Sequence, residues 1–271
     1  MIDQRQAVRD QLCRALEVDL MQEAAVRGVF YGGSVATGET DTWSDIDVRI
    51  VVDDASFSAF IAEKQVRPER WGNVLFYEDP GKHLPYTIIH YRSFVKIDCF
   101  YYRQSELKPD PFFRSIWVVY DPGETLAALK EQSAGTMREP SAEDVERWRG
   151  KVFAYLHEIR RRTERDEQYY ARQCADMLSW SLAAGWLMGR GDMPDGFGNW
   201  SKLEGPRSRL TEMEQKQLQA LGRLTEPMER ARLFIPMFLS VHSRVCTALD
   251  MPEKRDWAEE ICSMIDRSIE S

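Results

Sequence analysis

The chain has 271 residues, 43% of them hydrophobic and 11% aromatic, which is enough to bury one large core or two ordinary ones. Its formal net charge of −8 argues against a broad nucleic-acid-binding surface. No apolar run approaches the ~20 residues of a membrane-spanning helix. The polar start Met1-Ile-Asp-Gln-Arg-Gln predicts no signal peptide, and so a cytoplasmic protein.

The first predicted element is a helix over residues 3–26, with apolar side chains at helical spacing that would pack against a sheet. A strand follows and ends in a Gly-Gly-Ser turn at residues 32–34, beyond which a polar loop leads to a second strand. Gly32 and Gly33 allow positive φ and a close approach of the backbone, so their amides could face a phosphate. Ser34 adds a hydroxyl donor where a short helix could begin.

The second strand begins with two carboxylates on one face. Asp45, Asp47 and Arg49 alternate with apolar residues, so the two aspartates point the same way. Unpaired, they would repel each other, and a hard cation such as Mg²⁺ removes that repulsion. The alternative is an Asp-x-Asp pair that arises by chance in an acidic chain, with an ordinary turn before it.

A P-loop is the other alternative for this stretch, because residues 33–40 nearly fit its Gly-rich pattern. Glu39 stands where that motif needs its phosphate-binding lysine, and an acid there would repel phosphates. The P-loop is therefore rejected.

Gly33-Ser34, ten intervening residues and then Asp45-Ile46-Asp47 resemble the signature of the DNA polymerase β-like nucleotidyltransferase superfamily. The overall layout is most similar to lincosamide and aminoglycoside nucleotidyltransferases. Many of those relatives carry a basic residue where this chain has Thr37, which leaves open what neutralises the phosphates here. Arg49 could supply the missing positive charge, although an ion pair between Arg49 and Asp47 is an equal alternative.

The resemblance implies a third carboxylate on a later strand, and Asp98 is the candidate. Residues 94–101 alternate again, and Asp98 lies with Lys96 on the less apolar face. Asp98 is interpreted as the third member of a carboxylate triad. A simple salt bridge to Lys96 is the alternative.

The remaining elements predict an α+β fold with two domains. A short helix over 56–65 and strands over 73–77, 86–91, 94–101 and 116–120 complete a mixed sheet with helices on one side. From Ser141 onward the chain is predicted to be helical. We therefore expect a nucleotidyltransferase catalytic domain over 1–138 and a helical domain over 139–271, with the helices at about 142–164, 167–189, 211–222, 227–249 and 254–269.

An apolar helix in the second half bears on possible dimer formation, and the spacing of the cysteines and histidines bears on metal binding. The apolar helix around Trp180 is expected to serve as core or as a homodimer face. Five widely spaced cysteines contain no Cys-x-x-Cys, and four histidines show no zinc-ligand spacing. Free thiols are therefore expected, without a zinc site.

The resemblance implies transfer of a nucleoside monophosphate, expected to be AMP, from an NTP to a hydroxyl of a small molecule such as a lincosamide or aminoglycoside antibiotic. Asp45, Asp47 and Asp98 would hold two Mg²⁺ ions, Gly33 and Ser34 would bind the β,γ-phosphates, and Asp98 would also be the candidate base. The alternative is a nucleotidyltransferase-like antitoxin that modifies or binds a partner protein.

Overall fold

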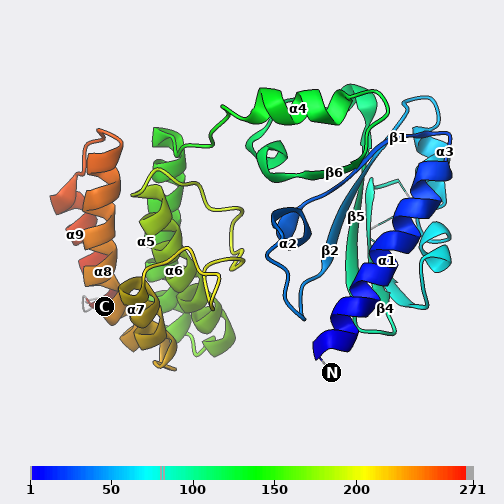
Figure 1. Ribbon diagram of the computed structural model, residues 1–271. Coiled ribbons are helices and arrows are strands. Elements are labelled where there is room, and N and C mark those ends of the chain that lie inside the picture. The colour runs from blue at the N-terminus through cyan, green and yellow to red at the C-terminus, as the bar shows by residue number, and fades with distance from the viewer. Residues whose placement is uncertain (1, 80, 82, 267–271) are drawn as a thin grey trace. The chain divides into compact units, whose positions relative to one another are not determined.

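A computed structural model describes residues 2–79, 81 and 83–266 (Figure 1). The chain divides into two compact units, Met1–Met137 and Arg138–Ser271. Three hydrophobic clusters follow the same division, two in the first unit and one in the second. Each unit therefore has its own core. That the first unit is a catalytic domain stays a prediction.

The first unit is built on a six-stranded mixed sheet, as the sequence predicts. The strand order is β3-β4-β5-β2-β1-β6. β2 and β5 pair in parallel, whereas β1 with β2, β1 with β6, β3 with β4 and β4 with β5 are antiparallel. The strands are β1 (Val26–Tyr31), β2 (Ile46–Val52), β3 (Val74–Glu78), β4 (Tyr86–Tyr91), β5 (Lys96–Arg103) and β6 (Trp117–Tyr120).

Helices cover one face of this sheet and part of the other. On the first face α1 (Ile2–Gln22) buries Leu12, Leu16 and Leu20, which recur every four residues along one side of the helix. α3 (Phe57–Ala62) adds its own apolar side chains to the same cluster. The short α2 (Gly33–Thr37) follows β1 directly.

The prediction of helices on one side only is wrong. Phe30 and Val51 project from the opposite face of the sheet, where α4 (Thr125–Ser133) covers them with Leu126 and Leu129. α4 was not predicted. The 3₁₀ turns of this unit are Arg67–Arg70, Gln104–Glu106 and Pro111–Ser115.

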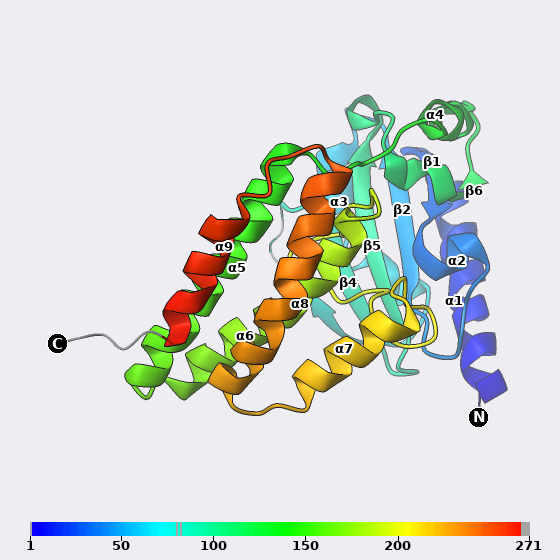
Figure 2. The ribbon, with the colours of Figure 1, turned by 90° about the vertical axis from the view of Figure 1, so that its left-hand side faces the viewer.

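The second unit is helical, as predicted, and α5, α8 and α9 run alongside one another in it (Figure 2). Ser141 and Thr211 begin α5 and α7 with capping boxes, each accepting a hydrogen bond from the backbone N–H three residues on. Predicted residues 267–269 lie outside the described part of the chain. The helices are α5 (Ala142–Glu164), α6 (Gln168–Met188), α7 (Glu212–Gly222), α8 (Pro227–Ala248) and α9 (Arg255–Ser263), followed by a 3₁₀ turn at Met264–Asp266.

Two further expectations concern membranes and thiols. Within residues 2–79, 81 and 83–266, no helix combines the length and the apolar character needed to cross a bilayer. All five cysteines are free thiols, and four of them are buried. α6 is largely buried within its own unit, which confirms the expectation that this apolar helix forms core.

Candidate active site

Two of the three predicted carboxylates face each other across the parallel strand pair. Asp47 on β2 is the register partner of Asp98 on β5, and neighbouring strands lie about 4.8 Å apart. Asp45 immediately precedes β2. Ile46 and Val48 are fully buried on the opposite face, so the alternation of β2 holds the acids on the half-exposed face.

Lys96 joins the third carboxylate to this pair. Its Nζ donates to Asp98 Oδ2 at 2.9 Å and lies 3.0 Å from Asp45 Oδ2. Burial alone would lower the pKa of Lys96, but the two carboxylates outweigh it and raise the pKa to about 12. The salt bridge that the sequence offered as an alternative for Asp98 is therefore present. The contact of Lys96 with Asp45 was not predicted.

The carboxylates keep an excess of negative charge in spite of Lys96. Burial raises the pKa of Asp47, and the charges of Asp45 and Asp98 raise it further against the opposing pull of Arg49 and Lys96. Arg49 Nη2 is 3.8 Å from Asp47 Oδ1, so this ion pair is loose. Asp98 Oδ1 is buried and has no hydrogen-bond partner in the described part of the chain. A buried acceptor left in this way is costly unless something binds it.

The Gly-Gly-Ser turn packs directly against Asp47. Gly32 N–H donates to the backbone carbonyl of Asp47 at 2.9 Å. Gly33 has a φ of +57°, and a Cβ there would lie 2.1 Å from Asp47 Oδ2. Only glycine fits both the backbone conformation and this approach. Ser34 follows in the first turn of α2, whose backbone N–H groups have no acceptor within the helix.

A buried arginine holds the loop between α2 and β2. Arg9 on α1 is 4% exposed and donates to the Asp41 carbonyl at 2.7 Å and to Thr40 Oγ1 at 3.1 Å. Asp41 Oδ1 in turn accepts from Trp43 N–H and from the Ser44 hydroxyl. This network fixes the residues just before Asp45. The sequence analysis missed it, because Arg9 lies more than thirty positions away.

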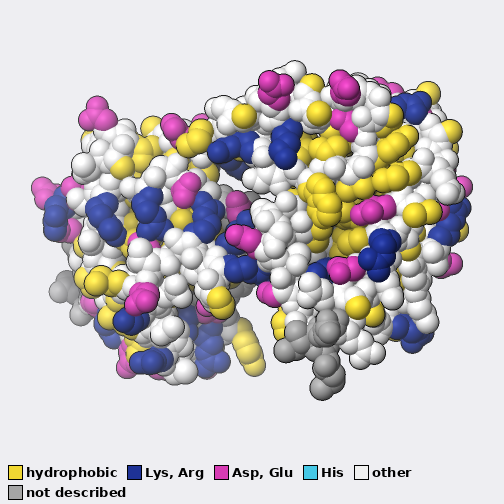
Figure 3. Space-filling view, viewed as in Figure 1, with side chains coloured by type: hydrophobic (Ala, Val, Ile, Leu, Met, Phe, Trp, Pro, Cys, Tyr) yellow, Lys and Arg dark blue, Asp and Glu magenta, His cyan; other side chains and the backbone are white. Residues whose placement is uncertain are grey.

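The carboxylate face continues into aromatic side chains. The Arg49 guanidinium lies 4.0 Å from the centre of the Phe100 ring and 5.5 Å from that of Phe112. Phe100 stacks in turn on Tyr86 at 5.5 Å between ring centres. Figure 3 shows hydrophobic side chains gathered on the surface of this unit below α4. Arg49 therefore lies between Asp47 and the rings of Phe100 and Phe112.

The donor set fits a divalent cation in its chemistry, although the side chains are not closed around one. Three carboxylates converge, and one buried oxygen of Asp98 lacks a partner, which suits a hard ion. In the present side-chain positions, the described residues contain no group of three or more His, Cys, Asp or Glu side chains that could hold a metal ion. Lys96 occupies the space between Asp45 and Asp98, so its ammonium would have to leave for an ion to enter.

Residues 13–105 match the family described as the nucleotidyltransferase domain. This segment includes every predicted site residue, from Gly33 to Asp98. No curated protein matches the chain.

Two solved structures are similar to this chain at a low level. An aminoglycoside 6-adenyltransferase from Bacillus subtilis aligns at 12% identity and a TM-score of 0.41, covering 96% of this chain and 98% of that one. A nucleotidyltransferase-like protein from Exiguobacterium sibiricum 255-15 aligns at 15% identity and a TM-score of 0.41, covering 89% of this chain and 78% of that one. At these values neither structure assigns an activity to this chain.

Proposed function

We propose that the chain transfers a nucleoside monophosphate from an NTP to a hydroxyl of a small molecule, a proposal supported by the match of residues 13–105 to the nucleotidyltransferase domain family. AMP is the group we expect it to transfer. The observation that carries the proposal is the buried, unpartnered Oδ1 of Asp98 beside Asp47, in a cluster whose charge Lys96 neutralises only in part. The catalytic domain is assigned to residues 1–138 and a helical domain to 139–271.

On the donor side, Asp45, Asp47 and Asp98 would hold Mg²⁺, with two ions expected. Bound there, Mg²⁺ would offset the charge of the triphosphate and of the departing pyrophosphate. Lys96 must first release Asp45 and Asp98, and its ammonium is then free to meet a phosphate oxygen. This lysine offers a source of positive charge that Thr37 does not provide.

Gly33 and Ser34 would bind the β,γ-phosphates. Gly33 is exposed, and its lack of a side chain leaves room beside Asp47 for a phosphate to approach the backbone. The first-turn N–H groups of α2 and the Ser34 hydroxyl are donors with the right polarity. These contacts would hold the leaving group in line with the attacking oxygen.

In the transfer itself, the acceptor hydroxyl oxygen forms a bond to the α-phosphorus, and the bond from that phosphorus to the bridging oxygen of pyrophosphate breaks. The hydroxyl proton must go to a base. Asp98 is the candidate, because its Oδ1 already has a free acceptor position. The products are the adenylylated acceptor and pyrophosphate.

The test is incubation of the full chain with ATP labelled at the α-phosphate, Mg²⁺ and a panel of hydroxyl-bearing small molecules that includes aminoglycosides and lincosamides. We expect label on one small molecule and release of pyrophosphate. Label found only on protein would favour the antitoxin-like alternative. No transfer to either, from ATP or from the other NTPs, would contradict the proposal.

A further inference from the structure

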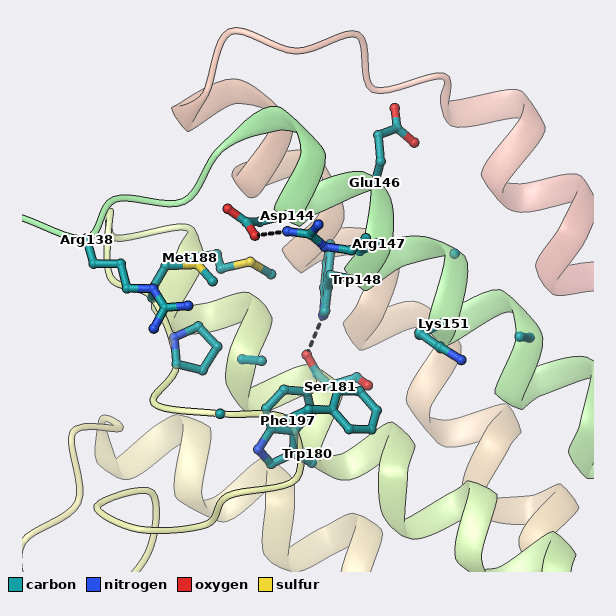
Figure 4. Close-up of a pocket in the computed structure, with 16 residues that line it drawn as sticks. Arg138, Asp144, Glu146, Arg147, Trp148, Lys151, Trp180, Ser181, Met188 and Phe197 are labelled. Carbon is teal, nitrogen blue, oxygen red and sulfur yellow. Dashed lines mark hydrogen bonds and ion pairs between the residues drawn. The ribbon is translucent and has the colours of Figure 1, made fainter. Parts of the chain in front are cut away.

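The helical unit contains a cavity of about 780 Å³ between α5, α6 and the loop that follows α6 (Figure 4). Its size lies within the ~300–1,000 Å³ of small-molecule sites. All its lining residues belong to the second unit, and none is close in sequence to Asp45, Asp47 or Asp98. We propose that this cavity, which we call the α5–α6 pocket, binds a flat, largely apolar small molecule that carries a negative charge.

Aromatic side chains form the walls, and their polar atoms are already satisfied. The Trp148 indole N–H donates to the Ser181 carbonyl at 2.7 Å. The Trp180 indole N–H donates to the Asn199 carbonyl at 3.0 Å. Both rings are therefore fixed in place, and because Trp148 is 7% and Trp180 5% exposed, each presents only a small apolar area to the cavity.

Phe197 extends this aromatic wall from the loop. Its ring centre lies 4.9 Å from that of Trp180, and the two planes meet at 61°. Phe197 is 61% exposed, so most of its ring surface is open to a ligand. An aromatic ligand that entered the pocket would cover the Phe197 ring and would give it apolar contacts.

The charged residues at the pocket determine which sign of ligand charge it favours. Asp144 is paired with Arg147, and hydrogen bonds from Ser141 hold the pKa of the Asp144 carboxyl at about 2. Glu146 is paired with Arg149. Both acids that line the pocket are therefore ion-paired, although Arg147 also pairs with Glu143. A polycation would find no free carboxylate among them.

The two remaining charged residues at the pocket are cations. Lys151 and Arg138 are exposed, and among residues 83–266 they have no ion-pair or hydrogen-bond partner. Figure 4 shows them on opposite sides of the pocket. Either could pair with a carboxylate or sulfonate on a ring that lies against the exposed surface of Phe197. This inference goes beyond the proposed transfer and does not depend on it.

The test is calorimetric titration of the full chain with two probes that share one ring system. The first is 1-naphthalenesulfonate and the second is 1-naphthylmethylammonium. We expect the sulfonate to bind more tightly than the ammonium. Lys151→Gln should weaken sulfonate binding by up to about fivefold, the upper end for one exposed ion pair. Phe197→Ala should weaken both probes.

Lys216→Gln is the matched control, because Lys216 is an exposed lysine of α7 outside the pocket. Circular dichroism would verify that all variants fold, and Asp47→Asn should bind the sulfonate as wild type does. Equal or tighter binding of the ammonium would overturn the inference. So would absence of sulfonate binding, or equal effects of the Lys151 and Lys216 substitutions.

Discussion

The carboxylate cluster and the α5–α6 pocket treat their charged groups in opposite ways. In the cluster, Lys96 pairs with Asp45 and Asp98, Asp47 has only a loose ion pair with Arg49, and one buried oxygen of Asp98 has no partner among the described residues. In the pocket, both lining acids are paired with arginines, although Arg147 also pairs with Glu143, and the lining charges without a described partner are positive. We therefore propose a cation as the ligand of the first region and an anion as the ligand of the second. Unbalanced charge, more than the size of a cavity, therefore distinguishes what each region can bind.

The largest expected effect is that of Asp47→Asn on transfer. The substitution removes one ligand charge while it keeps the shape of the side chain, so we expect activity to fall by about 100-fold or more. The free energy of unfolding in EDTA should stay the same or rise, because ionised Asp47 is partly buried beside two other acids. Glu131→Gln, at an exposed carboxylate of α4, is the control. Wild-type turnover in Asp47→Asn would refute the site assignment.

The pair Gly33→Ala and Gly38→Ala separates backbone strain from steric contact with the cluster. Both glycines have positive φ, so each substitution should cost about 1 kcal/mol of stability. Only at Gly33 would the new Cβ meet Asp47, since a Cβ at Gly38 has nothing within 4 Å. We expect transfer to fall about 100-fold in Gly33→Ala and only slightly in Gly38→Ala, as measured in the labelled-ATP assay. Equal losses would show that the contact with Asp47 is irrelevant.

Replacing Lys96 tests whether its ammonium takes the place of a metal ion. In EDTA, Lys96→Met should lower the free energy of unfolding by up to about 1 kcal/mol, because the carboxylates lose their partner. With the competing cation gone, Mn²⁺ should bind severalfold more tightly, as measured by electron paramagnetic resonance. Lys216→Met should change neither quantity. Weaker Mn²⁺ binding in Lys96→Met would contradict this role.

The smallest effect is a difference in titration between Asp47 and Asp144. The pKa of Asp47 is raised and that of Asp144 is held at about 2, below its ordinary value of 3.8. Asp144 therefore stabilises the folded state above about pH 4, and this contribution is lost as the pH falls towards 2. Ionised Asp47 destabilises the folded state at neutral pH, and protonation removes that cost. Carboxyl-carbon NMR in EDTA should show Asp47 titrating at a higher pH than Asp144. The reverse order would contradict the prediction.

The elements that the sequence predicted well are those whose pattern is local. The alternation of β2 places Asp47 and Arg49 on one face, and the boxes at Ser141 and Thr211 start their helices where expected. Each of these signals lies within a few neighbouring residues. The choice of Asp98 as a third carboxylate came instead from the resemblance to a family, and the parallel pairing that places it beside Asp47 was not predicted.

What the sequence missed depends on contacts between distant residues. Arg9 reaches the loop before Asp45 from another element, and Lys96 contacts Asp45 across fifty-one positions. α4 is short, and its Leu126 and Leu129 become recognisable only once they cover Phe30 and Val51. The periodicity of a single segment does not predict such contacts. The charge balance of the cluster therefore required the folded structure.

The most direct test of the central claim is a crystal structure of the full chain with Mg²⁺ and a non-hydrolysable ATP analogue. The account predicts metal density between Asp45, Asp47 and Asp98, with Lys96 turned away from both of its present partners. It also predicts the β,γ-phosphates against Gly33 and Ser34. A triphosphate bound elsewhere, with Lys96 still bridging Asp45 and Asp98, would contradict it.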